Sequence, residues 1–112
     1  MAEKIIKPWG YEELLSVTDR YVMKRMVIKP NHRMSLQYHK VKEETVYVVD
    51  GLLIVETDQE GRTMLTPGCI YHVKPGEIHR FGADRDGPVV LIECSTTELD
   101  DVVRLEDDYS RN

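Results

Sequence analysis

Four side chains of types that bind divalent metals lie at short spacings along this chain. Gln37 and His39 are two residues apart, Glu44 follows five residues later, and His79 comes from a later segment. Side chains two apart on a β-strand point to the same face. Two imidazoles, a carboxylate and an amide make a metal site that leaves positions open for a ligand. We therefore predict a metal centre here. If the loop before Glu44 were shifted by one residue, Glu43 would supply the carboxylate instead.

The segments that must position these residues have the pattern of short strands between turns. Apolar and β-branched residues concentrate in the runs 21–29, 34–39, 44–49, 52–57, 62–65, 69–73, 78–81 and 89–94. Turn signals separate the runs, including Asp50-Gly51, 58–61 and Pro75-Gly76. This spacing is typical of an all-β sandwich or barrel. Sustained helical periodicity is absent, although 97–103 could form one helical turn.

The length and composition of the chain fit one domain. They give no indication that the protein binds a nucleic acid or a membrane. The 112 residues predict a single barrel at about 13–95, with an N-terminal arm at about 1–12 and a tail at about 96–112. The net charge of −5 argues against nucleic-acid binding. No signal peptide or membrane-spanning run is evident, so we expect a cytoplasmic protein. Cys69 and Cys94 lie in apolar runs without metal spacing and are expected to be buried free thiols.

Two motifs resemble those of the cupin superfamily. Gln37-x-His39-x4-Glu44-x6-Gly51 resembles the first cupin motif, and its glycine favours Glu44 over Glu43 as the ligand. The run from Gly68 to His79 resembles the second motif, which supplies the last histidine. The resemblance implies a jelly-roll barrel, also called a double-stranded β-helix. Phosphomannose isomerases carry glutamine where most cupins place the first histidine.

A closer resemblance covers almost the whole chain. The segments 7–12, 24–30, 34–39 and 101–111 are similar to the C-terminal cupin domain of type II mannose-6-phosphate isomerases. The resemblance implies one divalent metal, with zinc as first choice and manganese, iron, cobalt or nickel as alternatives. It implies interconversion of mannose 6-phosphate and fructose 6-phosphate, or of a closely related pair. It also implies a stand-alone form without the nucleotidyltransferase of many relatives. Altered neighbours at 40–46 leave the sugar undecided.

The implied isomerisation moves a proton between C1 and C2, which needs a base and a phosphate anchor. The candidate acid–base groups are Lys24, His72, Glu77 and Arg80. The candidate substrate-binding residues are Arg25, Arg80 and Tyr38. Strand alternation directs Arg80 outward if His79 points inward. The sequence does not choose among these residues.

The pattern of apolar residues along one predicted strand also indicates self-association. Met34, Leu36 and Tyr38 alternate with the expected metal-facing residues, which would leave an apolar outer face. We therefore expect a homodimer built on this strand. Alternative functions are another cupin sugar isomerase or epimerase, a metal-dependent dioxygenase, and a non-enzymatic sugar-binding module, because one fold hosts many chemistries.

Overall fold

The described part of the chain, residues 3–58 and 61–111 of a computed structural model, contains eleven strands and no helix. They are β1 (Glu3–Lys7), β2 (Gly10–Val17), β3 (Val22–Ile28), β4 (Leu36–Tyr38), β5 (Glu44–Asp50), β6 (Leu53–Thr57), β7 (Gly61–Leu65), β8 (Ile70–Val73), β9 (His79–Ala83), β10 (Val89–Ser95) and β11 (Val103–Glu106). The expected all-β class is confirmed. Of the turn predicted at 58–61, residues 59 and 60 lie outside the described residues.

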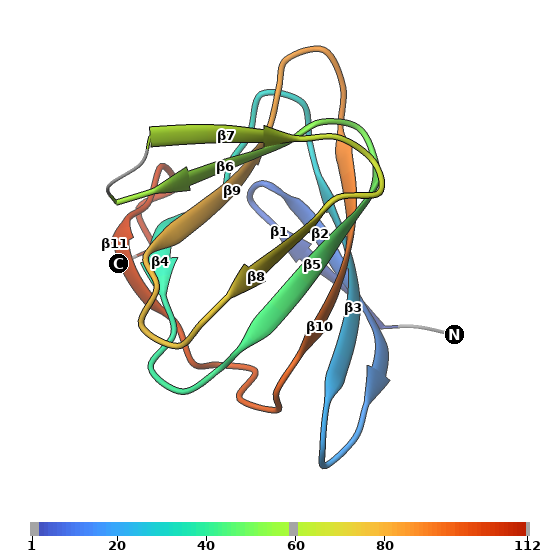
Figure 1. Ribbon diagram of the computed structural model, residues 1–112, viewed down its shortest axis with the longest axis vertical. Coiled ribbons are helices and arrows are strands. Elements are labelled where there is room, and N and C mark those ends of the chain that lie inside the picture. Colours follow the sequence, from blue (N-terminus) through green and yellow to red (C-terminus); the bar gives the residue numbers. More distant parts are fainter. Residues whose placement is uncertain (1–2, 59–60, 112) are drawn as a thin grey trace.

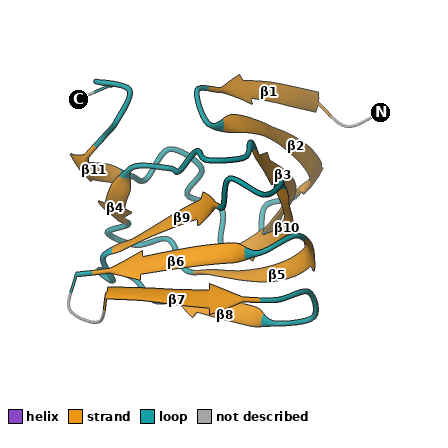
Figure 2. Ribbon diagram, turned by 90° about the horizontal axis from the view of Figure 1, so that it is seen from above, coloured by secondary structure: helices purple, strands orange, loops and turns teal. Residues whose placement is uncertain are grey.

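The strands form two antiparallel sheets that face each other across the interior (Figures 1 and 2). One sheet has the order β1-β2-β3-β10-β5-β8, and the other has the order β11-β4-β9-β6-β7. Neighbours in each sheet are often far apart in sequence, as with β3 and β10. Residues of the predicted N-terminal arm form β1 and the start of β2, and residues of the predicted tail form β11.

The interior is divided into an apolar part and a polar part. Strict alternation places one face of β3, β5 and β10 inside, as the period of a strand requires. The largest fully buried apolar side chains include Phe81, Met26, Ile28, Leu53 and Leu91. The polar and charged side chains buried with them include Lys24, Ser35, His39, Lys42, Glu44, His79 and Glu93. Burial of so many charges indicates a site, because a buried charge is costly unless it is compensated.

Three sequence expectations about single segments are wrong. The segment 97–102 contains a bend and a turn instead of a helical turn, and Val103 begins β11. Cys94 is exposed and Cys69 is half-buried, and both are free thiols, so neither is the buried group expected. Met34 packs in the core with 8% exposure, because the chain enters strand geometry only at Leu36 and alternation does not extend back to it. Met34 therefore does not belong to the outward-facing apolar row on which the homodimer was predicted.

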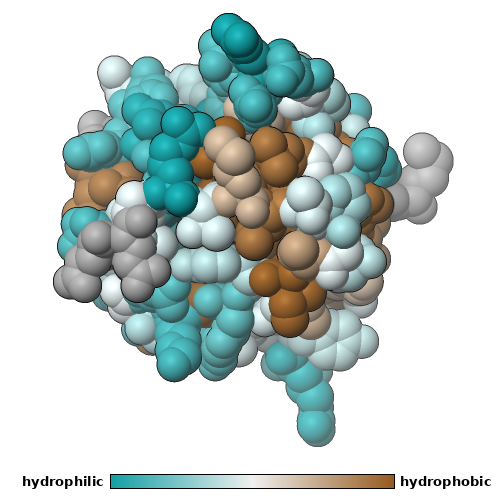
Figure 3. Space-filling model, turned by 45° about the horizontal axis from the view of Figure 1, so that its top comes forward, coloured by the Kyte–Doolittle hydropathy of each residue, from teal (hydrophilic) through white to brown (hydrophobic). Residues whose placement is uncertain are grey.

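The surface mixes polar and apolar regions. On the face displayed in Figure 3, apolar side chains gather near the centre and polar side chains surround them. Among the described residues, no helix is long and apolar enough to span a membrane.

The turn after β5 supplies a test of the barrel's close packing. Gly51 has φ of +84°, and a Cβ added there would lie 2.2 Å from the carbonyl oxygen of Pro88. Gly76 has a similar φ of +82° but open space around it. We expect Gly51→Ala to lower the free energy of unfolding by about 3 kcal/mol, and Gly76→Ala by about 1 kcal/mol, in denaturant titrations. Equal losses would show that backbone strain alone, without the contact to Pro88, sets the cost.

Candidate metal centre

Three predicted ligands converge inside the barrel from separate strands. Their donor atoms all lie within 4.8 Å of one another, and all three side chains are buried. His39 follows β4, Glu44 opens β5, and His79 opens β9. The Oε1 atom of Glu44 lies 2.8 Å from Nε2 of His39 and 3.6 Å from Nε2 of His79. One carboxylate oxygen therefore faces two imidazoles, which is a suitable arrangement for one cation.

Both imidazoles are held by their other ring nitrogen. Nδ1 of His39 lies 2.6 Å from the carbonyl oxygen of Asp101, and Nδ1 of His79 lies 3.0 Å from that of Glu77. A carbonyl accepts only, so each Nδ1 carries a proton and each ring directs its Nε2 atom inward, toward Glu44. Nε2 of His79 is buried and has no hydrogen-bond partner in the structure. These residues fit a divalent metal, because it would satisfy both nitrogens and the carboxylate together.

Glu44 is kept ionised by its surroundings. Burial opposes its charge, but the hydrogen bond with Glu93, the adjacent imidazoles of His39 and His79 and the charge of Lys42 hold the pKa of Glu44 well below its usual range. Burial and the adjacent Glu44 charge raise the pKa of Glu93 to about 8. Glu93 therefore carries its proton at neutral pH and donates it to Glu44. Lys42, whose Nζ lies 3.3 Å from Glu93, adds a positive charge beside the pair.

Gln37 lies next to the three converging residues. It pairs with His79 in the register of β4 and β9 and lines the adjoining pocket. Its Oε1 accepts a hydrogen bond of 2.7 Å from the hydroxyl of Ser35. An amide oxygen fixed in this way remains able to bind a cation with its second lone pair. Its role as a fourth ligand remains a prediction.

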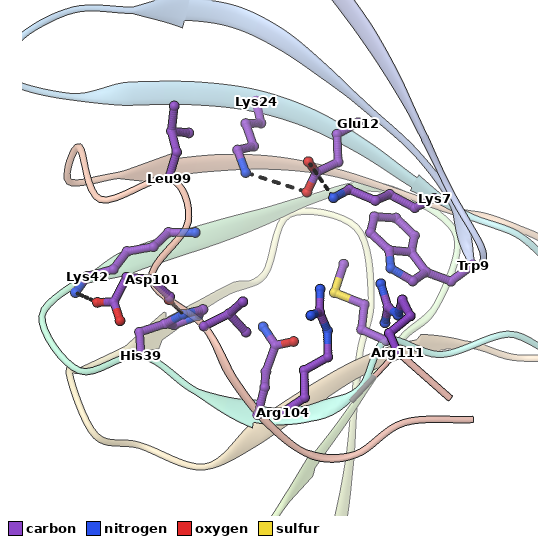
Figure 4. Close-up of a pocket in the computed structure, with 13 residues that line it drawn as sticks. Lys7, Trp9, Glu12, Lys24, His39, Lys42, Leu99, Asp101, Arg104 and Arg111 are labelled. Carbon is purple, nitrogen blue, oxygen red and sulfur yellow. Dashed lines mark hydrogen bonds and ion pairs between the residues drawn. The ribbon is translucent and has the colours of Figure 1, made fainter. Parts of the chain in front are cut away.

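A pocket rich in cations opens beside the ligands (Figure 4). Its lining comprises Lys7, Trp9, Glu12, Lys24, Met34, Gln37, His39, Lys42, Leu99, Asp101, Val102, Arg104 and Arg111. Glu12 lies 3.5 Å from Nζ of Lys24 and 4.0 Å from Nζ of Lys7. Figure 4 shows Arg104 and Arg111 across the cavity from these three residues. The pocket can therefore accept an anion although the whole chain is acidic.

The C-terminal segment brings two arginines to this pocket. Arg104 lies on β11, which pairs with β4, and its buried Nε has no hydrogen-bond partner among the described residues. The guanidinium of Arg111 donates two hydrogen bonds to Asp107, at 2.8 and 3.1 Å. Asp108 holds the segment to the barrel through Arg33 at 2.7 Å. The sequence predictions omitted both pocket arginines, although the resemblance at 101–111 had marked this segment.

Asp101 fastens the same segment beside His39. Besides its carbonyl contact to His39, its carboxylate accepts backbone hydrogen bonds from Lys40, Val41 and Lys42 at 2.7–3.0 Å. These three bonds lower the pKa of Asp101 to about 2. Its carboxylate therefore stays ionised in the neutral range, and it fixes the loop between His39 and Glu44.

Most other predicted site residues lie away from this pocket. Arg25 is on the outer side of β3, paired with Glu13 at 3.2 Å. The exposed His72 pairs with Glu43, which excludes Glu43 from the cluster of converging ligands. Glu77 accepts from the hydroxyl of Tyr71. Among the four acid–base candidates, Lys24 is the one that the lining of the described pocket includes. The catalytic roles of all four remain predictions.

Arg80 and Tyr38 are also outside the described pocket lining. As alternation predicts, Arg80 points away from the interior occupied by His79. Its buried guanidinium donates to the carbonyl oxygens of Met34 and Glu106, at 3.0 and 3.2 Å. Tyr38 is half-buried in β4 and pairs with Val103. Arg80 therefore attaches the C-terminal segment to the barrel.

Comparison with known proteins decides the family. The model of the mannose-6-phosphate isomerase C-terminal family matches residues 1–107. The chain belongs to this family. The xanthan biosynthesis protein XanB of Xanthomonas campestris is 32% identical over 96% of this chain and 24% of its own length. The mannose-1-phosphate guanylyltransferase ManC of Salmonella typhimurium is 33% identical over 99% of this chain and 24% of its own length.

The chain thus spans about a quarter of the length of the curated relatives that it matches. A cupin-like protein from Thermotoga maritima has a similar fold, with a TM-score of 0.75 and 23% identity. That alignment covers 88% of this chain and 78% of the other. The predicted cupin barrel and the family resemblance are both confirmed.

Replacing one converging imidazole should abolish metal binding. We expect His79→Ala to lower metal affinity at least about a hundredfold, because a buried donor is lost from the set. His72→Ala is the matched control, since His72 lies on the outer surface beside Glu43. Metal content by elemental analysis and affinity by competitive titration check this result. Full metal content in His79→Ala would contradict the site.

The contacts of Asp101 predict that replacing this residue weakens metal binding, although Asp101 is not itself one of the predicted ligands. Asp101→Ala removes three hydrogen bonds to the 40–42 backbone, so His39 and Glu44 lose a common support. We expect metal affinity to fall about tenfold while the fold persists. The neighbouring Asp100→Ala is the control, and circular dichroism with metal titration provides the measurement. Equal affinities for the two variants would show that the loop needs no such support.

Proposed function

We propose that this chain is a metal-dependent sugar-phosphate isomerase that interconverts mannose 6-phosphate and fructose 6-phosphate. Family membership supports the reaction class. The single observation that carries the proposal is the buried, unpaired Nε of Arg104 in a pocket that adjoins the candidate metal ligands. An isomerase of this kind needs a cation for phosphate and a Lewis acid for the sugar oxygens in one cavity.

The charges of the pocket favour a phosphorylated ligand. Five of its lining side chains are cationic, namely Lys7, Lys24, Lys42, Arg104 and Arg111, whereas Glu12 and Asp101 are acidic. Asp101 is already engaged by backbone N–H groups, and Arg111 by Asp107. Arg104 has no such partner in the described chain, and its guanidinium can donate to phosphate oxygens in a forked arrangement. We therefore assign Arg104 as the main phosphate anchor, with Arg111 beside it.

The opposite wall supplies groups for proton transfer. Lys24 is almost fully buried and pairs with Glu12 at 3.5 Å. When both groups are charged, Glu12 can accept a proton and Lys24 can donate one. We assign proton movement between C1 and C2 to this pair, in place of His72, Glu77 or Arg80. A metal bound by His39, Glu44, His79 and Gln37 would polarise the sugar's carbonyl and hydroxyl oxygens.

The direct test is an assay of purified chain loaded in turn with zinc, manganese, iron, cobalt or nickel. Conversion of mannose 6-phosphate to fructose 6-phosphate is expected with at least one metal. Absence of turnover with all five would refute the isomerase proposal. Calorimetric binding of the sugar phosphate without turnover would favour the sugar-binding module, whereas turnover of another sugar would favour a different cupin isomerase or epimerase.

Arg104 provides a sharper test of the substrate class. We expect Arg104→Ala to raise the KM for mannose 6-phosphate about tenfold to a hundredfold, because a charge-assisted contact to phosphate is lost. Metal content should not change, since Arg104 is not a ligand. Arg62→Ala, an exposed arginine outside this pocket, should leave the KM unchanged. If Arg104→Ala matched the control, phosphate would bind elsewhere.

A further inference from the structure

Each of the three converging ligands is held by a partner that lies behind it. The Nδ1 atoms of His39 and His79 lie 2.6 and 3.0 Å from backbone carbonyl oxygens. Glu44 is held by its hydrogen bond with Glu93. Such contacts fix the direction of a ligand before a metal binds. Gln37, the predicted fourth ligand, needs an equivalent partner.

Ser35 supplies this partner. Its side chain is fully buried, with 0% of the residue exposed, and its Oγ lies 2.7 Å from Oε1 of Gln37. A buried hydroxyl is costly unless it makes a hydrogen bond, so folding itself favours this contact. Ser35 does not belong to the lining of the described pocket, whereas Gln37 does. Ser35 can therefore act on a bound cation through Gln37 rather than by direct contact.

The backbone that carries Ser35 is fixed by β9. The N–H of Met34 donates to the carbonyl oxygen of Phe81 at 2.8 Å. The carbonyl oxygen of Met34 accepts from Nε of the buried Arg80 at 3.0 Å. Both backbone polar groups of the residue before Ser35 are thus bonded to the strand that His79 opens. The hydroxyl of Ser35 is consequently held in a fixed relation to a strand that supplies a metal ligand.

Gln37 occupies the central position of one row across the five-stranded sheet. The register pairs it with His79 on β9 and with Arg104 on β11. Residues opposite each other in antiparallel strands point to the same face and have Cβ atoms about 5 Å apart. The buried Nε of Arg104 has no hydrogen-bond partner among the described residues, so it could attract the amide oxygen of Gln37 away from a cation. A contact that holds this oxygen in place therefore matters for metal binding.

The chemistry of glutamine makes such a contact more important. A glutamine side chain has several rotatable bonds and is among those that lose most conformational freedom when they are fixed. The hydrogen bond from Ser35 imposes this loss when the chain folds, so the loss does not weaken metal binding later. The second lone pair of Oε1 remains free to bind a cation.

We propose that Ser35 is a positioning residue of the metal centre, whose hydroxyl holds the amide oxygen of Gln37 in place for a divalent cation bound at the converging ligands. The inference rests on the metal centre of the proposed function and not on its reaction, so it can be tested without a sugar phosphate. Removal of one hydroxyl outside the pocket lining should weaken metal binding in the same way as a partial loss of Gln37.

Competitive titration of the full chain with zinc tests the proposal through a double-mutant cycle. Ser35→Ala should lower zinc affinity about tenfold, and Gln37→Ala should lower it by at least as much. In the Gln37→Ala background, Ser35→Ala should lower it by less than about a further twofold, because the residue through which Ser35 acts is already absent. Ser16→Ala is the matched control, since Ser16 is a half-buried serine of β2 outside the pocket lining. It should bind zinc like the unaltered chain.

Three results of this cycle would overturn the proposal. They are an unchanged zinc affinity in Ser35→Ala, an unchanged affinity in Gln37→Ala, and an effect of Ser35→Ala that persists in full without Gln37. The last result would show a general loosening of the barrel, which denaturant titrations of the metal-free variants measure separately. A chain that binds no zinc or cobalt would overturn the metal centre and this inference together.

The visible absorption of the cobalt-loaded chain reports the ligand set directly, because the bands of Co²⁺ depend on the number and type of its donors. Gln37→Ala and Ser35→Ala should shift these bands in the same direction, whereas Ser16→Ala should leave them unchanged. A Ser35→Ala spectrum identical to that of the unaltered chain would refute the positioning role. A chain that gives the expected zinc and cobalt results but converts no sugar phosphate would refute the proposed isomerase and leave the role of Ser35 intact.

Discussion

The structure depends on the compensation of one buried negative charge. Glu44 is ionised inside the barrel, within reach of two imidazoles whose Nδ1 protons are already given to carbonyl oxygens. Neither ring can then neutralise the carboxylate without taking up a second proton. A divalent cation removes this conflict, because it accepts both Nε2 lone pairs and the carboxylate at once. Glu93 contributes a neutral donor on the remaining side of Glu44, so its proton stabilises the carboxylate without adding another charge.

The C-terminal segment supports the residues around this buried charge. Asp101 holds both His39 and the loop that leads to Glu44. Beyond it, β11 pairs with β4, and Arg80 and Arg33 attach the acidic residues that follow. The same segment then presents Arg104 to the pocket. One continuous segment therefore both supports His39 and brings Arg104 to the pocket. If the proposed function is right, loosening this segment would weaken both metal binding and substrate binding.

The sequence predicted local and motif-based features well, and long-range placement less well. The positions of the strands could be predicted from the sequence, because the alternation of residues within a strand and the turn residues at its end are local features, as at Asp50-Gly51. The convergence of His39, Glu44 and His79 could be predicted, because strand periodicity and motif spacing both indicated it. The contacts of Arg80 could not be predicted, because its partners are the carbonyl oxygens of Met34 and Glu106, which are far away in sequence. Arg104 was missed for the same reason: its position depends on the pairing of β11 with β4, which no local pattern specifies.

The central strands of the larger sheet invert the polarity that a soluble sheet usually has. On β3 and β10, Lys24 and Glu93 point inward while Met23 and Ile92 point outward, and β5 likewise places Glu44 inside and Tyr47 outside. Each inversion is unfavourable in an isolated chain, because charges lose water and apolar groups gain it. A cation and an anionic substrate bound inside the barrel would compensate the charges that these strands direct inward.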